Sequence, residues 1–454
     1  MKRKHLLLAS TVGMLMSFSL ISCDDDDEVK VPVETVTEVA FSDENTDESK
    51  VSGILSWTAP ASVTNITKYV IYTSADGKTK GTKIMEVPAT ETSCKIENLD
   101  NPGYLLVVAA NEFGESAVCA AVKVQDGRTV LEHFYFLSSG KMGNNNSSLY
   151  MYDVKTKKMT PDYFAAQNGR GLGDTAQDML VYGSKMYIAV YGESTIEVTD
   201  LEAKSIKQIK TEGAPRALTS KDGKVYVSYY NGYVARLDTA SLQVDATAKV
   251  GRNPEQLAIS GDKLYVANSG GMDYNTPAGY DKTVSVVDLA SFKEEKKIDV
   301  VINPCNMTVD NQGDIYLVSM GNYGDVPNTL QRIDAKTGTA SVITETNATE
   351  LASDGDNLYM FYSQYDANWN QVISYIAYDA INEKVLRDNF ITDGTTIDKV
   401  YKMGVVKDFV YFSTSDYVND GDVYFYSKDG KLVDKFEAGL NPMRVVYAQA
   451  VDFK

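Results

Sequence analysis

The chain has few of the residues on which most enzyme active sites depend. Its two histidines are His5, in an apolar N-terminal segment, and His133. One histidine cannot supply both a catalytic triad and a histidine metal cage, and no G-x-S-x-G, H-E-x-x-H or P-loop motif or EF-hand spacing occurs. We therefore expect no catalytic residue, no metal site and no cofactor. A carboxylate-pair glycosidase and calcium bound in an Asp- and Asn-rich loop stay open.

Positive charge is also scarce. The 44 lysines and arginines face 62 aspartates and glutamates, which gives a net charge of −18. Such a chain cannot neutralise phosphates, so nucleic acid is excluded as a partner. The 43% hydrophobic content supports a large core, and 454 residues predict at least two domains. Thirty tyrosines are typical of a β-rich exported protein.

The N-terminus has the pattern of an export signal. Basic residues 2–4 precede an apolar run, Leu6 to Ile21, that is too short for a stable membrane span. The run ends in Leu-Ile-Ser-Cys, which resembles a bacterial lipobox. This resemblance implies a signal peptide over 1–22 and lipid on the thiol of Cys23. An uncleaved signal anchor is the alternative.

The acidic linker that completes 23–30 begins with the run Asp24–Glu28. Such runs are usually solvated spacers. Directly behind the lipid-bearing cysteine, this one resembles the surface-export signal of Bacteroidetes outer-membrane lipoproteins. We therefore expect an outer-membrane protein that is exposed on the cell surface and touches the membrane through its lipid anchor only.

A repeat occupies most of the chain, and the stretch Gly251 to Asp288 shows one unit. Each unit has a tyrosine inside an apolar alternation, an apolar residue about eight positions before it, and a closing Asp (or Ser427) after a later strand. The tyrosines are Tyr135, Tyr187, Tyr226, Tyr265, Tyr316, Tyr359 and Tyr411. Alternating runs between Gly, Asp and Asn turns predict strands, and a period of about 40–50 residues predicts propeller blades.

The two ends of the repeat predict how it closes. The first tyrosine has no Asn-Pro strand before it, whereas an unpaired Asn441-Pro442 segment lies near the C-terminus. The last strand should therefore complete the first blade, which removes exposed sheet edges. We predict an all-β protein with a seven-bladed β-propeller over 130–454.

A separate β domain over 31–126 precedes the propeller. The stretches Gly53–Pro60, Lys68–Gly77 and Ile96–Ala117 resemble a fibronectin type III module, with Trp57 as its core tryptophan. Such a β-sandwich is expected to act as a spacer. Cys94 and Cys119 fall in this module, where a disulfide and two free thiols both stay open. Cys305, in a propeller strand, is expected to pack.

Loop lengths predict where function lies. The loops between the second and third strands vary most, and the long ones cover 140–148, 268–282, 319–328, 363–371 and 415–421. They are rich in Tyr, Asn, Gly and Asp, and rigid aromatics among amides form adaptable contact surfaces. A single tyrosine of this kind is more often incidental. The candidate ligand-binding residues are Tyr191, Arg216, Tyr230, Asn268, Tyr274, Tyr323, Tyr365, Trp369, Tyr417 and Arg444.

Polar and charged residues just before the apolar mark are expected at the inner rim of the same face. They are Asp178, Arg216, Glu255, Gln256, Asn306, Glu350, Lys402 and Arg444. Such a ring either lines a water-filled channel or orients a ligand. The closing aspartates recur at strand ends before turns. We expect them to hydrogen-bond their own turns and not to act in catalysis.

The unit N-P-x-x-L…KLYVANSGG…TVSVVDLAS resembles the YncE-like propellers over the whole 130–454 region. Together with the lipoprotein signal, this resembles the cobalamin-capturing surface propellers that cover an outer-membrane corrinoid transporter. The resemblance implies a binding protein for cobalamin or another corrinoid, with that transporter as partner. A glycan-binding lipoprotein of a polysaccharide-uptake system is the alternative, and a glycoside-cleaving propeller is a third.

Overall fold

The computed structural model describes residues 31–45, 50–125, 128–365, 368 and 371–453. The chain divides into two compact units, Met1–Val130 with Val451–Lys454, and Leu131–Ala450. We call them unit 1 and unit 2. The structure is 56% strand and 2% helix, so the predicted all-β class is confirmed.

Unit 1 consists of two antiparallel sheets that share one core. The first sheet has the order β1-β2-β5 and comprises β1 (Thr37–Asp43), β2 (Lys50–Thr58) and β5 (Ser93–Asp100). The second has the order β4-β3-β6 with β7 and β8 beside β6, and comprises β3 (Lys68–Ser74), β4 (Lys83–Pro88), β6 (Tyr104–Asn111), β7 (Gly114–Glu115) and β8 (Ala120–Lys123). Trp57 is buried in the shared core, with its ring 5.2 Å from that of Tyr69. Cys94, Cys119 and Cys305 are free thiols.

Unit 2 contains seven four-stranded sheets within the described residues. The first comprises β9 (Arg128–Ser138), β10 (Ser148–Asp153), β11 (Lys158–Thr160) and β36 (Pro442–Phe453). The second comprises β12 (Ala176–Tyr182), β13 (Lys185–Val190), β14 (Thr195–Thr199) and β15 (Ser205–Lys210). The third comprises β16 (Pro215–Lys221), β17 (Lys224–Tyr229), β18 (Tyr233–Asp238) and β19 (Gln243–Lys249). The fourth comprises β20 (Pro254–Ser260), β21 (Lys263–Asn268), β22 (Thr283–Asp288) and β23 (Lys293–Asp299).

The remaining three sheets have the same pattern. The fifth comprises β24 (Pro304–Val309), β25 (Ile315–Ser319), β26 (Thr329–Ile333) and β27 (Ala340–Val342). The sixth comprises β28 (Glu350–Ser353), β29 (Asn357–Tyr365), β30 (Gln371–Asp379) and β31 (Lys384–Arg387). The seventh comprises β32 (Val400–Val406), β33 (Phe409–Thr414), β34 (Asp420–Ser427) and β35 (Leu432–Leu440).

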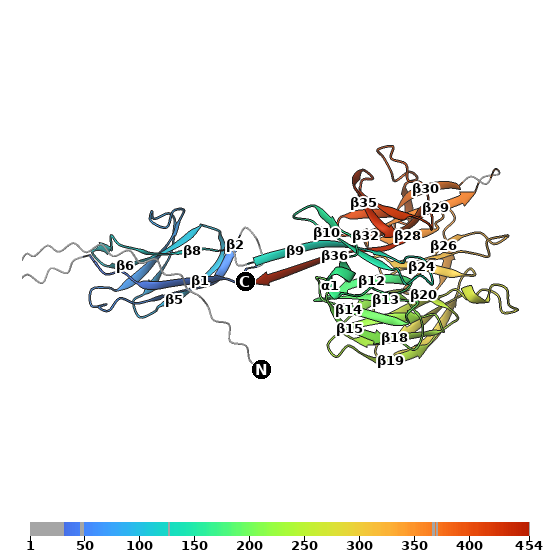
Figure 1. The fold of residues 1–454 in the computed structure, drawn as a ribbon, viewed down its shortest axis with the longest axis horizontal. Coiled ribbons are helices and arrows are strands. Elements are labelled where there is room, and N and C mark those ends of the chain that lie inside the picture. Colours follow the sequence, from blue (N-terminus) through green and yellow to red (C-terminus); the bar gives the residue numbers. More distant parts are fainter. Residues whose placement is uncertain (1–30, 46–49, 126–127, 366–367, 369–370, 454) are drawn as a thin grey trace, which may run out of the picture. The chain divides into compact units, whose positions relative to one another are not determined.

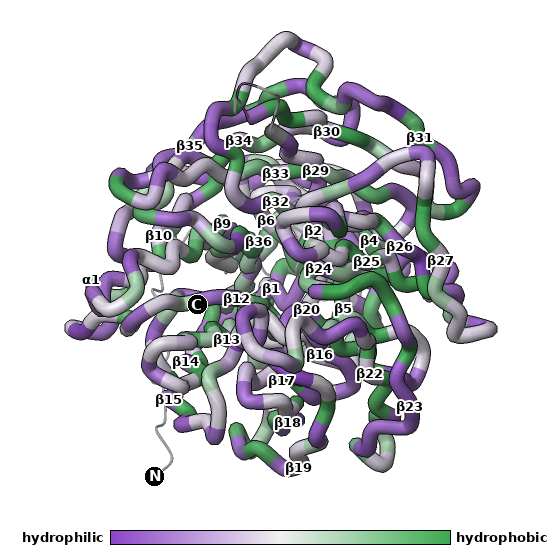
Figure 2. Tube along the Cα trace, turned by 90° about the vertical axis from the view of Figure 1, so that its right-hand side faces the viewer, coloured by the Kyte–Doolittle hydropathy of each residue, from purple (hydrophilic) through white to green (hydrophobic). Residues whose placement is uncertain are grey.

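The seven sheets form a propeller-like ring. From the second sheet to the seventh, the first strand of each sheet contacts the first strand of the next. Figure 2 shows β12, β16, β20, β24 and β32 near the middle of unit 2 and the fourth strands, such as β19 and β23, at its periphery. Among these outer strands, β23 has the sequence KEEKKID and is mostly exposed. Each sheet therefore buries its faces against its neighbours and turns its last strand to solvent.

Strand β36 closes the ring. It pairs with β9 in the first sheet, and the two strands run side by side in Figure 1. On one side Val446 and Ala448 of β36 pack with Met179, and on the other Val445 packs with Tyr411. The backbone N–H of Val445 also donates to the Tyr411 hydroxyl, at 3.2 Å. This confirms that the C-terminal strand completes the first sheet.

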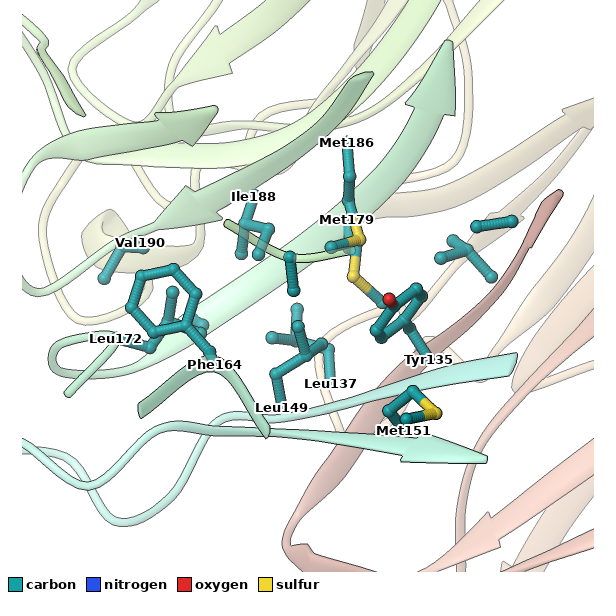
Figure 3. Packing of buried hydrophobic residues seen from close by; sticks show 14 residues of the cluster. Tyr135, Leu137, Leu149, Met151, Phe164, Leu172, Met179, Met186, Ile188 and Val190 are labelled. Atoms are coloured by element: carbon teal, nitrogen blue, oxygen red, sulfur yellow. The ribbon is translucent and has the colours of Figure 1, made fainter. Parts of the chain in front are cut away.

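The residues that mark the repeat form the cores between sheets. All seven repeat tyrosines are buried. Figure 3 shows the first such core, where Tyr135 of β9 and Met179 of β12 lie close together. Phe164 of the short helix α1 (Tyr163–Asn168) joins the same core. This helix occupies the unusually long connection between the first and second sheets, and the strand pattern gives no sign of it.

Candidate functional site

The candidate loop residues and the candidate rim residues lie on one face of unit 2. The start of each inner strand pairs with the end of the second strand, as in Pro215 with Tyr229, Pro254 with Asn268, and Val400 with Thr414. The loops between second and third strands therefore lie at the same face as the beginnings of the inner strands, as predicted. We call this the loop face.

Charged side chains from the inner strands surround a small cavity at the centre of the loop face. This mouth cavity has a volume of about 90 Å³. Its lining includes the predicted rim residues, which are Asp178, Arg216, Glu255, Gln256, Asn306, Glu350, Lys402 and Arg444. Three ion pairs join neighbouring sheets here: Arg444 with Asp178, Arg216 with Glu255, and Lys402 with Glu350. The rim thus carries three positive and three negative groups.

Of the three rim cations, Arg216 makes the most hydrogen bonds and ring contacts. Its Nε and Nη2 donate to Oε2 of Glu255, at 2.9 and 2.5 Å, and its Nη1 donates to Oε1 of Gln177, at 2.7 Å. The guanidinium lies 5.0 Å from the ring centre of Tyr230 and 5.8 Å from that of Tyr191. Burial alone would lower the pKa of Arg216, but Glu255 outweighs it and the pKa is raised. These contacts fix a charged guanidinium beside two tyrosine rings, a cation–π arrangement.

Arg444 is held far less closely. Its Nε lies 3.5 Å from Oδ1 of Asp178. Both Asp178 oxygens accept backbone N–H donors, from Met179 at 2.9 Å and from Leu218 at 2.8 Å. Burial raises the pKa of Asp178, and Arg444 and the two N–H donors act against this shift. Arg444 is the largest cause that offsets the burial of Asp178, but the two backbone N–H groups occupy both carboxylate oxygens, so the guanidinium keeps donors for other groups.

Exposed tyrosines lie on the loops of the loop face. Tyr274, Tyr323 and Tyr417 are 63%, 73% and 63% exposed. The ring of Tyr274 stacks on that of Tyr280, with 6.5 Å between centres, and Tyr417 meets the edge of Tyr401 at 5.6 Å. The hydroxyl of Tyr401 reaches Sδ of Met443 at 3.4 Å, so this pair stands next to the mouth. These rings offer apolar contact area at little conformational cost.

The structure places Asn268 differently from the prediction. This residue is fully buried at the end of β21. Its Oδ1 accepts from the N–H of Gly251 at 3.1 Å, and its Nδ2 donates to Thr283 and Ser285. The amide is therefore committed to the sheet and does not face a ligand. The prediction failed because Asn268 ends a strand whose last side chain points between the sheets.

Of the other predicted site residues, the structure brings together Tyr191, Arg216 and Tyr230, and it places Arg444 at the mouth cavity. Tyr274, Tyr323 and Tyr417 stand on separate loops. Tyr365 is the last residue of β29, and Trp369 and Cys23 lie outside the described residues. Sequence reasoning missed Gln177 and Tyr401. Each directly precedes a rim residue, Asp178 and Lys402, so their position in the repeat was the available signal.

A larger cavity continues from the mouth cavity along the centre of unit 2. Its volume is about 510 Å³. Gln256, Asn306, Glu350, Met403 and Arg444 line both cavities. Arg444 therefore lies at the boundary between the two spaces.

The closing aspartates have the structural role that the sequence predicts. Asp238, Asp288 and Asp334 each accept a 2.7 Å hydrogen bond from the backbone N–H three residues later. These bonds help to hold the pKa values of the three carboxyls below their ordinary value, and Lys224 and Lys263 are the largest cause at Asp238 and Asp288. Across the described residues, no group of three or more His, Cys, Asp or Glu side chains could hold a metal ion.

Comparisons with known proteins add little about function. No family model and no curated protein matches the chain. Among solved structures, a chain of hydrazine synthase from Kuenenia stuttgartiensis is similar, with 17% identity and a TM-score of 0.48 over 57% of this chain and 85% of that one. At this level the likeness supports no functional argument. No helix of the described residues is both long and apolar enough to cross a membrane.

Proposed function

We propose that this chain is a non-catalytic binding protein that captures a nutrient on the loop face, and that the nutrient is a corrinoid such as cobalamin. Unit 2 serves as a seven-bladed YncE-like propeller, and unit 1 as a fibronectin type III-like spacer. The observation that carries the proposal is the fixed Tyr191–Arg216–Tyr230 group beside the mouth cavity, together with the exposed Tyr274, Tyr323 and Tyr417 on loops of the same face.

The chemistry of a corrinoid fits this surface. A corrinoid is wide, with apolar ring edges and a fringe of amides, so it needs a broad face with aromatic contacts and many hydrogen-bond partners. The exposed tyrosines supply the contact area. Gln256, Asn306 and the rim ions supply donors and acceptors at the mouth cavity. Rigid aromatic anchors near polar groups are typical of tight binding sites.

We expect no protein histidine to replace a ligand of the corrinoid's cobalt, because the chain has few histidines. His133, the histidine of the described chain, is buried in β9. Its Nδ1 lies 3.3 Å from the Tyr135 hydroxyl, and its Nε2 lies 3.7 Å from Asp153. Burial lowers its pKa. This imidazole is committed to the core, so we expect the absorption spectrum of a bound corrinoid to stay nearly unchanged.

Glycan capture is the second candidate, and the stacked pair Tyr274 and Tyr280 favours it. Two nearly parallel tyrosine rings on an exposed loop form a platform on which a sugar ring could lie. A glycoside-cleaving activity has less support. The rim carboxylates Asp178, Glu255 and Glu350 are each ion-paired across a sheet boundary, whereas a carboxylate pair for glycoside cleavage must reach the substrate.

The cellular role follows from the N-terminal sequence and is part of the proposal. Lipid on Cys23 holds the protein at the outer membrane, and the acidic run Asp24–Glu28 directs it to the cell surface. The captured ligand passes to an outer-membrane transporter, which is the proposed partner.

Calorimetry on single-residue variants tests the site. Tyr323→Ala and Tyr417→Ala should each weaken cyanocobalamin binding, and loss of a central anchor should cost about 2 kcal/mol, or about thirtyfold in affinity. Phe113→Ala, which removes an exposed aromatic of unit 1, is the matched control and should leave binding unchanged. Equal affinity in all four proteins would place the site elsewhere. Parallel titrations with oligosaccharides would show whether the glycan alternative applies.

A further inference from the structure

Two positive side chains from adjacent inner strands line the same small cavity. Lys402 lies near the start of β32 and Arg444 near the start of β36, and both border the mouth cavity. Ser413 on β33 bridges the two strands, because its hydroxyl accepts from the backbone N–H of Lys402 at 3.2 Å and donates to the backbone oxygen of Pro442 at 2.8 Å. Like charges at neighbouring positions repel each other unless an anion lies near both. Glu350 on β28 lines the same cavity, pairs with Lys402 and also acts electrostatically on Arg444.

Arg444 has donors that the protein leaves unused. Among the residues that the structure describes, its contact is the 3.5 Å ion pair with Asp178, and it makes no hydrogen bond within normal geometry. Arg216, in the equivalent place two sheets away, donates three hydrogen bonds. A guanidinium has five N–H donors and binds carboxylate or phosphate in a bidentate manner. The Arg444 side chain is nevertheless 40% exposed to the channel, so a group entering from the loop face can reach it.

The size of the mouth cavity limits what can occupy it. The mouth cavity is small, at about 90 Å³ against about 510 Å³ for the cavity that continues from it. A small acid group therefore suits the mouth cavity, whereas a sugar ring or a corrin needs the broader loop face. Gln177, Gln256 and Asn306 also line the cavity and can hydrogen-bond the remaining oxygens of such a group.

We propose that the mouth cavity binds the acid group of the captured ligand, a carboxylate or a phosphate ester, through Arg444 and Lys402. The body of the ligand then rests on the tyrosines of the loop face. The inference rests on the proposed function, since it names the chemistry of one part of the ligand taken up at that face. In this proposal Arg444 binds and orients the acid group, and Lys402 helps to neutralise its negative charge.

Small anions test the site without any assumption about the whole ligand. The melting temperature of the full-length protein is measured against inorganic phosphate and, separately, acetate, with chloride keeping the ionic strength constant. We expect a saturable rise for at least one anion, and which of the two acts distinguishes a phosphate from a carboxylate site. Asp178→Asn/Arg444→Gln removes the buried ion pair as a whole, so that no unpaired charge remains, and should weaken this response at least tenfold.

Two further variants complete the test. Arg444→Lys should keep part of the response, because it retains the charge but not the bidentate fork. Lys399→Gln removes an exposed cation of the same face and should respond like the wild type. No saturable response in the wild type, or an equal response in the wild type and the double variant, would overturn the proposal.

A pair of corrinoids separates this inference from the proposed function. Cyanocobalamin carries a phosphodiester, and dicyanocobinamide lacks it. We expect the wild type to bind cyanocobalamin at least tenfold more tightly, and the double variant to bind the two alike. Equal binding of both by the wild type would overturn the acid-group site and leave corrinoid capture standing. A phosphate response that depends on Arg444, without binding of either corrinoid, would support the site and overturn corrinoid capture.

Discussion

At the scale of single residues, the Asn-Pro dipeptides explain how the loop face is built. Asn253, Asn303 and Asn441 each adopt a left-handed backbone, with φ of 44°, 62° and 58°. Asparagine tolerates this conformation better than most residues. Each amide then donates to a loop carbonyl: Asn253 to Tyr230, Asn303 to Gly321 and Asn441 to Gly140. The dipeptide therefore starts the inner strand and fastens the neighbouring functional loop.

Substitution of Asn303 tests this double role. Asn303→Ala loses the bond to Gly321 and adds backbone strain, so we expect the free energy of unfolding to fall by about 2 kcal/mol. Asn303→Gly loses only the bond and should cost about 1 kcal/mol. Urea unfolding of the three proteins gives both values. If alanine and glycine cost the same, the left-handed backbone is not the reason for asparagine here.

The closing aspartates predict a dependence of stability on pH. Hydrogen bonds from Lys263 and then Ser291 lower the pKa of Asp288 below its ordinary value of 3.8. A lowered folded-state pKa means that the stabilisation is present above pH 3.8 and is lost as the pH falls towards the folded-state value. The urea midpoints of wild type and Asp288→Asn should therefore differ more at pH 6 than at pH 3. A difference that does not change with pH would contradict this role.

Sequence could predict these residues only where the interaction is local. The turn bonds of Asp288 span three positions, so the motif alone was sufficient. The burial of Asn268 was missed, because its partners Gly251 and Ser285 lie 17 residues away in either direction. The ion pairs of the rim join residues about 40 positions or more apart. The repeat placed these residues on one face, but it could not show which charges pair.

At the scale of elements, the repeat predicted the sheets and their closure. The tyrosine and the apolar mark recur because each sheet buries these positions against its neighbours, and the closing aspartates recur because they hydrogen-bond their own turns. Helix α1 was not predicted, since it lies in the connection between sheets, where the repeat imposes no pattern. Elements that the periodic packing determines could be predicted from sequence, whereas elements inserted between the units could not.

The closure by β36 can be tested by deletion. Removing 441–454 takes away the strand beside β9, including Val445, and exposes the core around Tyr411 that Val445 covers. We expect the cooperative melting transition of unit 2 to be lost. An unchanged transition in the truncated protein would show that β36 is not needed for the ring.

Two point variants test the same core without removing a whole strand. Val445→Asp places a charge in the core between the first and seventh sheets, where the side chain is 4% exposed. Val433→Asp makes the same change in β35 at a side chain that is 54% exposed. The first variant should lose most of its stability, and the second should melt close to the wild type.

At the scale of the whole molecule, the proposed address can be tested by two changes near the N-terminus. Cys23→Ala should leave the protein without lipid and outside the membrane fraction. Neutral residues in place of Asp24–Glu28 should keep the lipid but reduce display on the surface. Protease treatment of intact cells measures display, and equal cleavage of wild type and neutralised protein would reject the acidic run as a sorting signal.

The central proposal is that the loop face binds a ligand without converting it. The most direct measurement is calorimetric titration of the purified full-length protein with cyanocobalamin, together with its absorption spectrum. We predict measurable heat, a raised melting temperature, a nearly unchanged spectrum and recovery of intact cyanocobalamin afterwards. No heat and no shift in melting temperature at a ligand concentration of about 100 μM, a hundredfold above a micromolar Kd, would contradict corrinoid capture.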